Sequence, residues 1–150
     1  MAGLARGEGS ERPNTDGEGV ASLVLLAARC ASRDQGRACH VLSRSGVAGE
    51  GIAAFLAALA LLRVATRGTL SFLPPAAPVV SRDESLLIEA LAGLQRGAPW
   101  VAQRAVAEWL APDLAVRAVA LLAKAAAGLA RAGLTPRSRR RQARRASGLA

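Results

Sequence analysis

The chain has 150 residues, of which 51% are hydrophobic and 3% aromatic, and its 20 basic and 11 acidic residues give a formal net charge of +9. This length fits one compact domain with tails better than two domains. Two cysteines exclude a disulfide-stapled secreted scaffold, a single histidine excludes a two-histidine zinc motif, and the apolar content excludes a wholly disordered chain.

The amino-terminal part is predicted to be a disordered head, residues 1–19. It is rich in Gly, Glu, Pro and Asn, and it has almost no apolar side chain whose burial would offset the entropy of ordering. Its net charge of −2 argues against a secretory signal, which begins with a positive segment.

A first helix is predicted over about Val20–Arg33, because apolar residues recur on one face at Val20, Leu23, Val24 and Ala27. The following residues, 37–51, leave two interpretations open. Val41 and Leu42 favour a short helical turn, whereas three glycines and two serines favour a loop.

The next helix is predicted to begin near Glu50, and its apolar residues recur at spacings of three and four: Ile52, Phe55, Leu56, Leu59 and Leu62. Arg63 and Arg67 are placed in its last turn, near the negative end of the helix dipole, with Gly68 as its cap. Its uncharged apolar run, 51–62, is 12 residues long, whereas a membrane span needs roughly 20. No membrane span is therefore predicted, and a cytoplasmic protein is expected.

Residues 69–73 alternate polar and apolar side chains, which is a weak strand signal without a partner strand in the chain. We therefore expect extended coil, with Leu70 and Phe72 packed against helices. The prolines in residues 74–78 predict an extended, polyproline-like connector.

The clearest local signal is Ser81-Arg-Asp-Glu84, which matches a capping box at the start of a helix. Asp83 adds a favourable charge in the first turn. The helix is predicted to end near Arg96, before Gly97, with a buried stripe of Leu87, Ile88, Leu91 and Leu94. Glu89 and Glu108 are expected at exposed helix positions.

Two further helices are predicted over about Pro99–Leu110 and Pro112–Ala132, the second closed by Gly133. Their short connections predict antiparallel or steeply angled neighbours. Of the two tryptophans, Trp109 is expected in the core, and Trp100 is expected to be half exposed and to anchor a partner.

The last helix repeats two kinds of residue every seven positions. Arg117, Lys124 and Arg131 form a cationic stripe, which we interpret as a solvated face. Small residues, namely Ala118, Ala125 and Ala132, let a neighbouring helix approach closely. Because two heptads are too few for a coiled coil, we interpret this stripe as a packed bundle face rather than a dimerisation seam.

Residues that carry chemistry are scarce in this sequence. Cys30, Cys39 and His40 are its only soft-metal ligands, and their spacing does not fit a closed zinc site, which wants four ligands. A buried free cysteine and a surface histidine are expected instead. The glycine-rich residues 46–51 lack the lysine of a phosphate loop. We predict no catalytic residue, no metal site and no cofactor.

The carboxyl-terminal tail, residues 135–150, is predicted to be disordered and carries no acidic residue. Its six arginines are candidates for polyanion binding, because blocks of like charge often contact phosphates: Arg137, Arg139, Arg140, Arg141, Arg144 and Arg145. The tail has no aromatic residue for base stacking, so such binding would be independent of sequence. A solubilising terminus and contact with anionic lipid or acidic protein remain alternatives.

Together these features predict an all-α protein: a compact bundle of four to five short helices, residues 20–134, between a disordered head and a basic tail. The expected function is that of a non-enzymatic helical interaction or adaptor protein that binds either a protein partner or a second copy of itself. The alternative is a nucleic-acid-associated protein whose tail arginines bind the phosphate backbone.

Overall fold

The computed structural model describes residues 17–136 and shows an all-helical protein. Its helices are α1 (Gly17–Ala31), α2 (Gln35–Arg44), α3 (Gly49–Ala65), α4 (Arg82–Gln95), α5 (Pro99–Ala107) and α6 (Pro112–Arg131). The all-α prediction is confirmed, but the expected four to five helices are six over the described residues. The predicted disorder of the head and tail falls largely on residues 1–16 and 137–150, outside this range.

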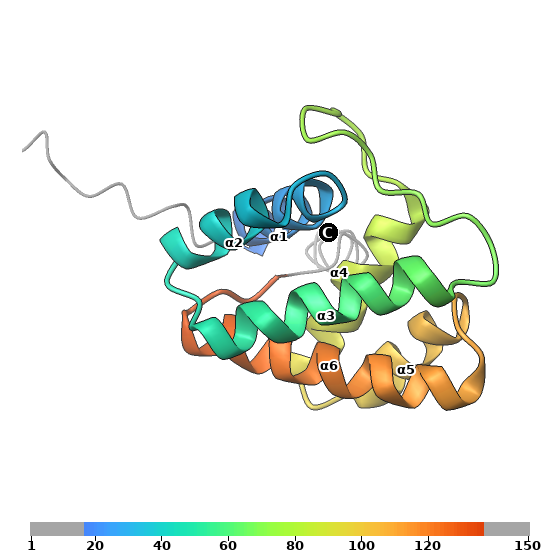
Figure 1. Ribbon diagram of the computed structural model, residues 1–150. Helices are drawn as coiled ribbons and strands as arrows, with labels where there is room; N and C mark the ends of the chain where they lie inside the picture. Colours follow the sequence, from blue (N-terminus) through green and yellow to red (C-terminus); the bar gives the residue numbers. More distant parts are fainter. Residues whose placement is uncertain (1–16, 137–150) are drawn as a thin grey trace, which may run out of the picture.

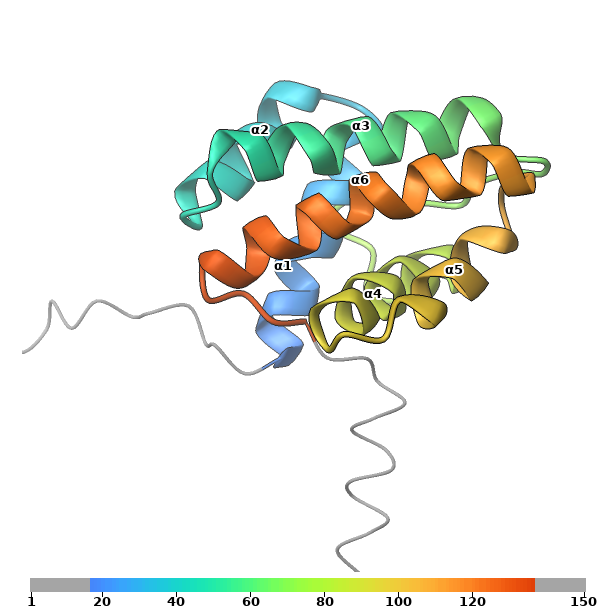
Figure 2. The same cartoon turned by 90° about the horizontal axis from the view of Figure 1, so that it is seen from below.

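The helices pack as three pairs: α1 with α2, α4 with α5, and α3 with α6. In Figure 1, α3 and α6 run side by side in opposite directions across the molecule, and α1 and α2 lie above them. Figure 2 shows α6 between α3 and the α4–α5 pair, in agreement with the contacts of α6 with all three. The short connection between α5 and α6 turns the chain back as predicted.

The core lies where the three pairs meet, and the residues predicted to be apolar stripes supply most of it. Its largest fully buried apolar side chains come from all six helices and from the turn after α5: Val24, Leu42, Phe55, Leu59, Leu62, Leu87, Leu91, Val106, Leu110 and Leu122. One charged side chain, that of Glu84, is as deeply buried as these.

The first two helices differ from their predicted bounds. α1 begins three residues earlier than expected and ends two residues earlier, at Ala31. In residues 37–51 the chain forms the helix α2 through Arg44 rather than only a short turn. Asp34 caps α2, since its side chain accepts a hydrogen bond from the Arg37 amide at 3.2 Å. Ala38 and Leu42, four positions apart, bury one face of this helix.

The helix α3 ends earlier than predicted. α3 stops at Ala65 with Thr66 as its cap residue, so Arg67 and Gly68 lie beyond it. The Arg67 guanidinium instead donates to the carbonyl oxygens of Ala107, at 2.8 Å, and Leu110, at 3.4 Å. The cation does meet the negative end of a helix dipole, but it is that of α5.

The remaining helices agree closely with the sequence. The capping box of α4 is present, with Ser81 accepting from the Glu84 amide and Glu84 accepting from the Ser81 amide. Pro99 and Pro112 start α5 and α6, while Gly97 and Gly133 adopt φ of 74° and 78° after α4 and α6, where a side chain would be strained. α5 ends at Ala107 rather than at Leu110.

Residues 66–81, which we call the α3–α4 segment, contain no helix or strand. Leu70 and Phe72 are half-buried against the core, as predicted for extended coil. The proline-rich part is not a continuous polyproline-like connector. It turns at Pro75, because the Ala77 amide donates to the Pro74 carbonyl oxygen at 3.0 Å, and proline is favoured at this turn position.

Candidate functional site

A buried ion pair joins α1 to the start of α4. The Arg29 guanidinium donates from Nε to Glu84 Oε2 at 2.6 Å and from Nη2 to Glu84 Oε1 at 3.0 Å. Arg29 is 6% exposed and Glu84 is fully buried. This two-point contact matches the planar fork of the guanidinium to the carboxylate and fixes the relative position of the two helices.

The same guanidinium holds the α3–α4 segment by its backbone. Nη1 donates to the carbonyl oxygen of Ala77 at 3.1 Å, and Nη2 donates to that of Val79 at 2.7 Å. Backbone carbonyls away from water need such donors, and this part of the segment lacks the regular hydrogen bonds of a helix or sheet. One arginine therefore orders the middle of a long loop.

The other side of the α3–α4 segment is held by the first turn of α4. The Asp83 carboxylate accepts from the Ser71 amide at 2.8 Å and from Trp109 Nε1 at 2.9 Å. Glu84 Oε2 also accepts from the Leu73 amide at 3.3 Å. We call Arg29, Asp83 and Glu84 the loop clamp, because these three side chains tie the segment to α1, α4 and the residues after α5.

Arg29 and Glu84 shift each other's pKa. Burial on its own would raise the pKa of the Glu84 carboxyl, but the hydrogen bonds from Arg29 and from the Ser81 and Leu73 amides outweigh it and hold the pKa below its ordinary value. The hydrogen bond to Glu84 raises the pKa of Arg29. Both residues are therefore charged at neutral pH.

This lowered pKa predicts acid-sensitive stability. The stabilisation from Glu84 is present above the pKa of an unfolded glutamate, about 4.3, and is lost as the pH falls through the lower pKa of the folded state. Thermal unfolding from pH 7 down to pH 3 should show melting temperatures that fall less steeply in Glu84→Gln than in the wild type. Glu108→Gln, which changes a half-exposed carboxyl, is the matched control. Equal slopes in Glu84→Gln and the wild type would contradict the assignment.

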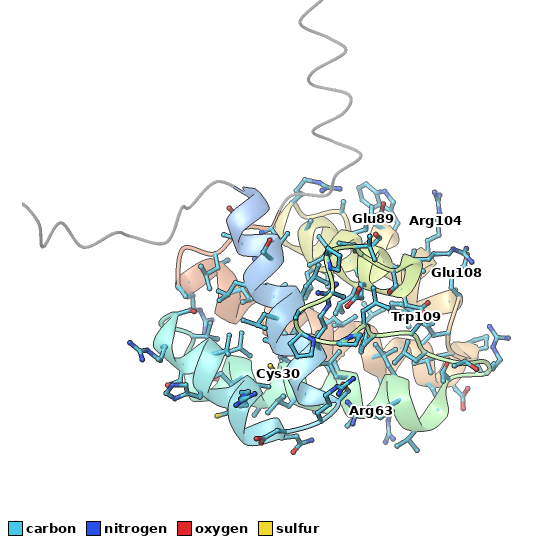
Figure 3. All side chains as sticks on the ribbon, turned by 90° about the horizontal axis from the view of Figure 1, so that it is seen from above. Cys30, Arg63, Glu89, Arg104, Glu108 and Trp109 are labelled. Atoms are coloured by element: carbon cyan, nitrogen blue, oxygen red, sulfur yellow. The ribbon has the colours of Figure 1, made fainter. Side chains whose placement is uncertain are left out.

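The second candidate site is the surface around Trp100, at the start of α5. This side chain is 61% exposed, whereas Trp109 is 4% exposed and packs in the core, so the two tryptophans lie as predicted. Figure 3 shows Trp109 within the molecule near the α3–α4 segment and Arg104 projecting outward from α5. The role of Trp100 as a partner anchor stays a prediction.

The other residues singled out in the sequence do not form a site. Cys30 is buried and Cys39 is exposed, both as free thiols, and His40 is exposed. Over residues 17–136, no three Cys, His, Asp or Glu side chains lie close enough to hold a metal ion. The cationic stripe of α6 is exposed, and its stripe of small residues packs within the bundle through Ala118 and Ala125. The six tail arginines lie outside the described residues.

Sequence reasoning missed the loop clamp. Glu84 and Asp83 were assigned only to the helix cap, and Arg29 received no role. The signal available in the sequence is that Arg29 lies among the apolar residues Ala27, Ala28, Cys30 and Ala31, all of which the structure buries. A charged residue surrounded in sequence by buried positions needs a partner.

Chemically, the loop clamp is suited to fixing a loop rather than to catalysis. Both Glu84 oxygens accept hydrogen bonds, and the carboxylate does not reach the surface. A general acid or base must reach the proton that it transfers, and this buried carboxylate does not face a surface where a substrate would bind.

The described residues thus define an all-α protein with an internally clamped loop and an exposed tryptophan. None of its described helices is long and apolar enough to cross a membrane. Comparisons with family models, with curated proteins and with solved structures find no match to the chain.

Proposed function

We propose that the protein is a non-enzymatic helical interaction protein that binds a protein partner through the surface around Trp100. The observation that carries this proposal is the 61% exposure of the Trp100 side chain. A tryptophan held in water forgoes the burial energy of a large aromatic ring. Tryptophan is enriched among the few residues that dominate binding energy at protein interfaces.

A fixed position for Trp100 supports this role. Pro99 starts α5 immediately before it, and Val101 packs so closely on Gly93 of α4 that a Cβ placed on that glycine would lie 2.7 Å from the Val101 Cβ. Arg67 and its amide hold the residues at the far end of α5. Because the ring sits on a helix fixed at both ends, binding would cost little ordering entropy.

The surroundings of Trp100 have the composition of an interface edge. Gln103 and Arg104, three and four residues further along α5, are both exposed. Residues at these spacings share a helix face. An aromatic anchor beside polar residues resembles the apolar centre and polar rim of protein interfaces.

Trp100→Ala is expected to weaken partner binding at least tenfold while leaving the fold intact, because the side chain is mostly outside the core. Proteins captured from cell extract by the full chain should be depleted with Trp100→Ala and retained with Val116→Ala, which trims another exposed apolar side chain. Circular dichroism should be the same for all three proteins. Equal capture by the two variants would contradict the proposal.

Trp100→Ala also distinguishes between two kinds of partner, a second copy of this chain and a different protein. In sedimentation velocity on the purified full chain, a self-associating protein shifts to larger species with concentration, and Trp100→Ala should remove this shift. A wild type that stays monomeric assigns the site to a different protein.

A further inference from the structure

The exposed side of α2 concentrates positive charge. Arg37, His40 and Arg44 are all exposed and lie three and four positions apart, which places them on one side of the helix. Arg33, also exposed, lies in the turn directly before it. We call these four residues the α2 basic face.

The fold does not use this charge. In the described part of the chain, ion pairs join Arg29 to Glu84 and Arg82 to Glu108, and neither includes an arginine of the α2 basic face. Asp34, the nearest acidic residue in sequence, accepts from the Arg37 amide as the helix cap. The next acidic residue along the chain is Glu50, beyond the end of α2.

Like charges along one side of a helix repel each other and weaken it. They are stabilised when an anion that carries several charges lies along the same side. Arg37 and Arg44 are seven residues apart, which corresponds to about 10 Å along the helix axis. An elongated anion with regularly spaced charges matches this arrangement better than a single small ion does.

The other side chains of α2 favour a nucleic acid over a lipid surface as the ligand of the α2 basic face. Its apolar side chains Ala38 and Leu42 are buried inside the bundle and Val41 is half-buried against the core. Its other exposed residues are Gln35, Gly36, Cys39 and Ser43. Helices that lie on membranes insert large apolar side chains beside their basic residues. The large exposed apolar side chains of this structure lie elsewhere, on α1, α3, α5, α6 and the α3–α4 segment.

The dimensions of a helix favour duplex DNA over duplex RNA. An α-helix with its side chains is about 10–12 Å wide, which fits the B-DNA major groove of about 12 Å. The major groove of A-form RNA is too deep and narrow for side chains to enter. In Figure 1, α2 lies at the edge of the molecule, and among the described helices it packs on α1 and α3 alone, so its other side is accessible from outside.

We propose that α2 docks on duplex DNA, with Arg33, Arg37 and Arg44 contacting phosphates and His40 lying between them. Guanidinium groups match phosphate geometry, and neutralising phosphates releases counterions, so binding is strong at low salt and weakens as salt rises. No part of this proposal depends on Trp100. The tail arginines, which lie outside the described residues, would add charge to the same interaction.

The test measures binding of the full-length protein to a short mixed-sequence DNA duplex by fluorescence anisotropy over a range of salt concentrations. The triple variant Arg33→Gln/Arg37→Gln/Arg44→Gln should bind at least tenfold more weakly at low salt. Its slope of log affinity against log salt should become less steep by about 2.7, since each lost phosphate contact contributes about 0.9.

The control Arg63→Gln/Arg96→Gln/Arg117→Gln removes the same charge from exposed positions on or beside α3, α4 and α6. Its slope should change by less than one contact, and Trp100→Ala should bind DNA like the wild type. Equal losses in both triple variants would overturn the proposal, as would an α2 variant that weakens binding to phosphatidylserine vesicles but not to DNA. Circular dichroism and thermal melting establish that each variant is folded.

Discussion

Arg29→Met is expected to lower the free energy of unfolding by about 3–5 kcal/mol, the range found when one partner of a buried ion pair is removed. The variant leaves the Glu84 carboxylate charged and fully buried. It also removes the donors to the Ala77 and Val79 carbonyl oxygens, so the α3–α4 segment loses its hold on α1. Urea denaturation followed by circular dichroism measures the loss.

The control for this prediction is Arg82→Met, which breaks an arginine–glutamate ion pair at the surface. Arg82 Nη2 lies 3.2 Å from Glu108 Oε2, and the two side chains are 77% and 46% exposed. Exposed pairs contribute about 0–1 kcal/mol, because water already solvates both charges. A loss from Arg82→Met as large as that from Arg29→Met would contradict the importance of burial.

A second variant distinguishes the destabilisation caused by the unpaired charge from the destabilisation caused by lost side-chain packing. In Arg29→Met/Glu84→Gln the buried carboxylate becomes a neutral amide that still has an oxygen to accept from the Ser81 amide. The double variant should be more stable than Arg29→Met alone. If it is equally unstable or less stable, the uncompensated charge is not the cause.

Hydrogen exchange at the Ser71 and Leu73 amides should accelerate in Arg29→Met, because the α3–α4 segment that these amides anchor opens.

Local sequence signals predicted local structure well. The capping box at Ser81 and Glu84, the prolines that start α5 and α6 and the glycines after α4 and α6 all lie where the sequence placed them. Each of these signals acts over a few residues, so a short window of sequence contains all the information needed. For residues 37–51 the sequence leaves a short helical turn and a loop open, because Val41 and Leu42 compete with three glycines and two serines. The Asp34 cap and the burial of Ala38 and Leu42 decide for the helix α2.

The interactions that position the loop clamp act over long distances in the chain and could not be predicted in this way. Arg29 and Glu84 are 55 residues apart, and Arg67 binds a carbonyl oxygen 40 residues away. Local sequence patterns correctly indicated the chemistry of Arg67 and Glu84. They gave the wrong helix end for Arg67 and no long-range partner for Glu84. Arg67 does bind a helix end, and Glu84 does cap α4, but only the packing of the bundle brings the second partner within reach.

Gly128→Val is expected to destabilise the protein by about 3 kcal/mol, near the upper end of the range for overpacking a core. α3 and α6 pack closely at Gly51 and Gly128, where a Cβ on Gly128 would lie 2.8 Å from the Gly51 Cα. The obstructing atom belongs to the backbone of a helix, so it cannot rotate away as a side chain would. The two most extensively packed helices would have to move apart.

Gly128→Ala is a smaller substitution at the same position, and Gly49→Ala, in the first turn of α3, is its control. A Cβ on Gly49 would meet no atom within 4 Å, so this change should be neutral or stabilise the helix by up to about 1 kcal/mol through the lost entropy of glycine. Gly128→Ala gains the same helix stabilisation but also introduces the clash with the Gly51 backbone. Its melting temperature should therefore fall below that of the wild type. If Gly128→Ala and Gly49→Ala melt alike, the close crossing of α3 and α6 is wrong, and with it the packing that brings α6 between α3 and the α4–α5 pair.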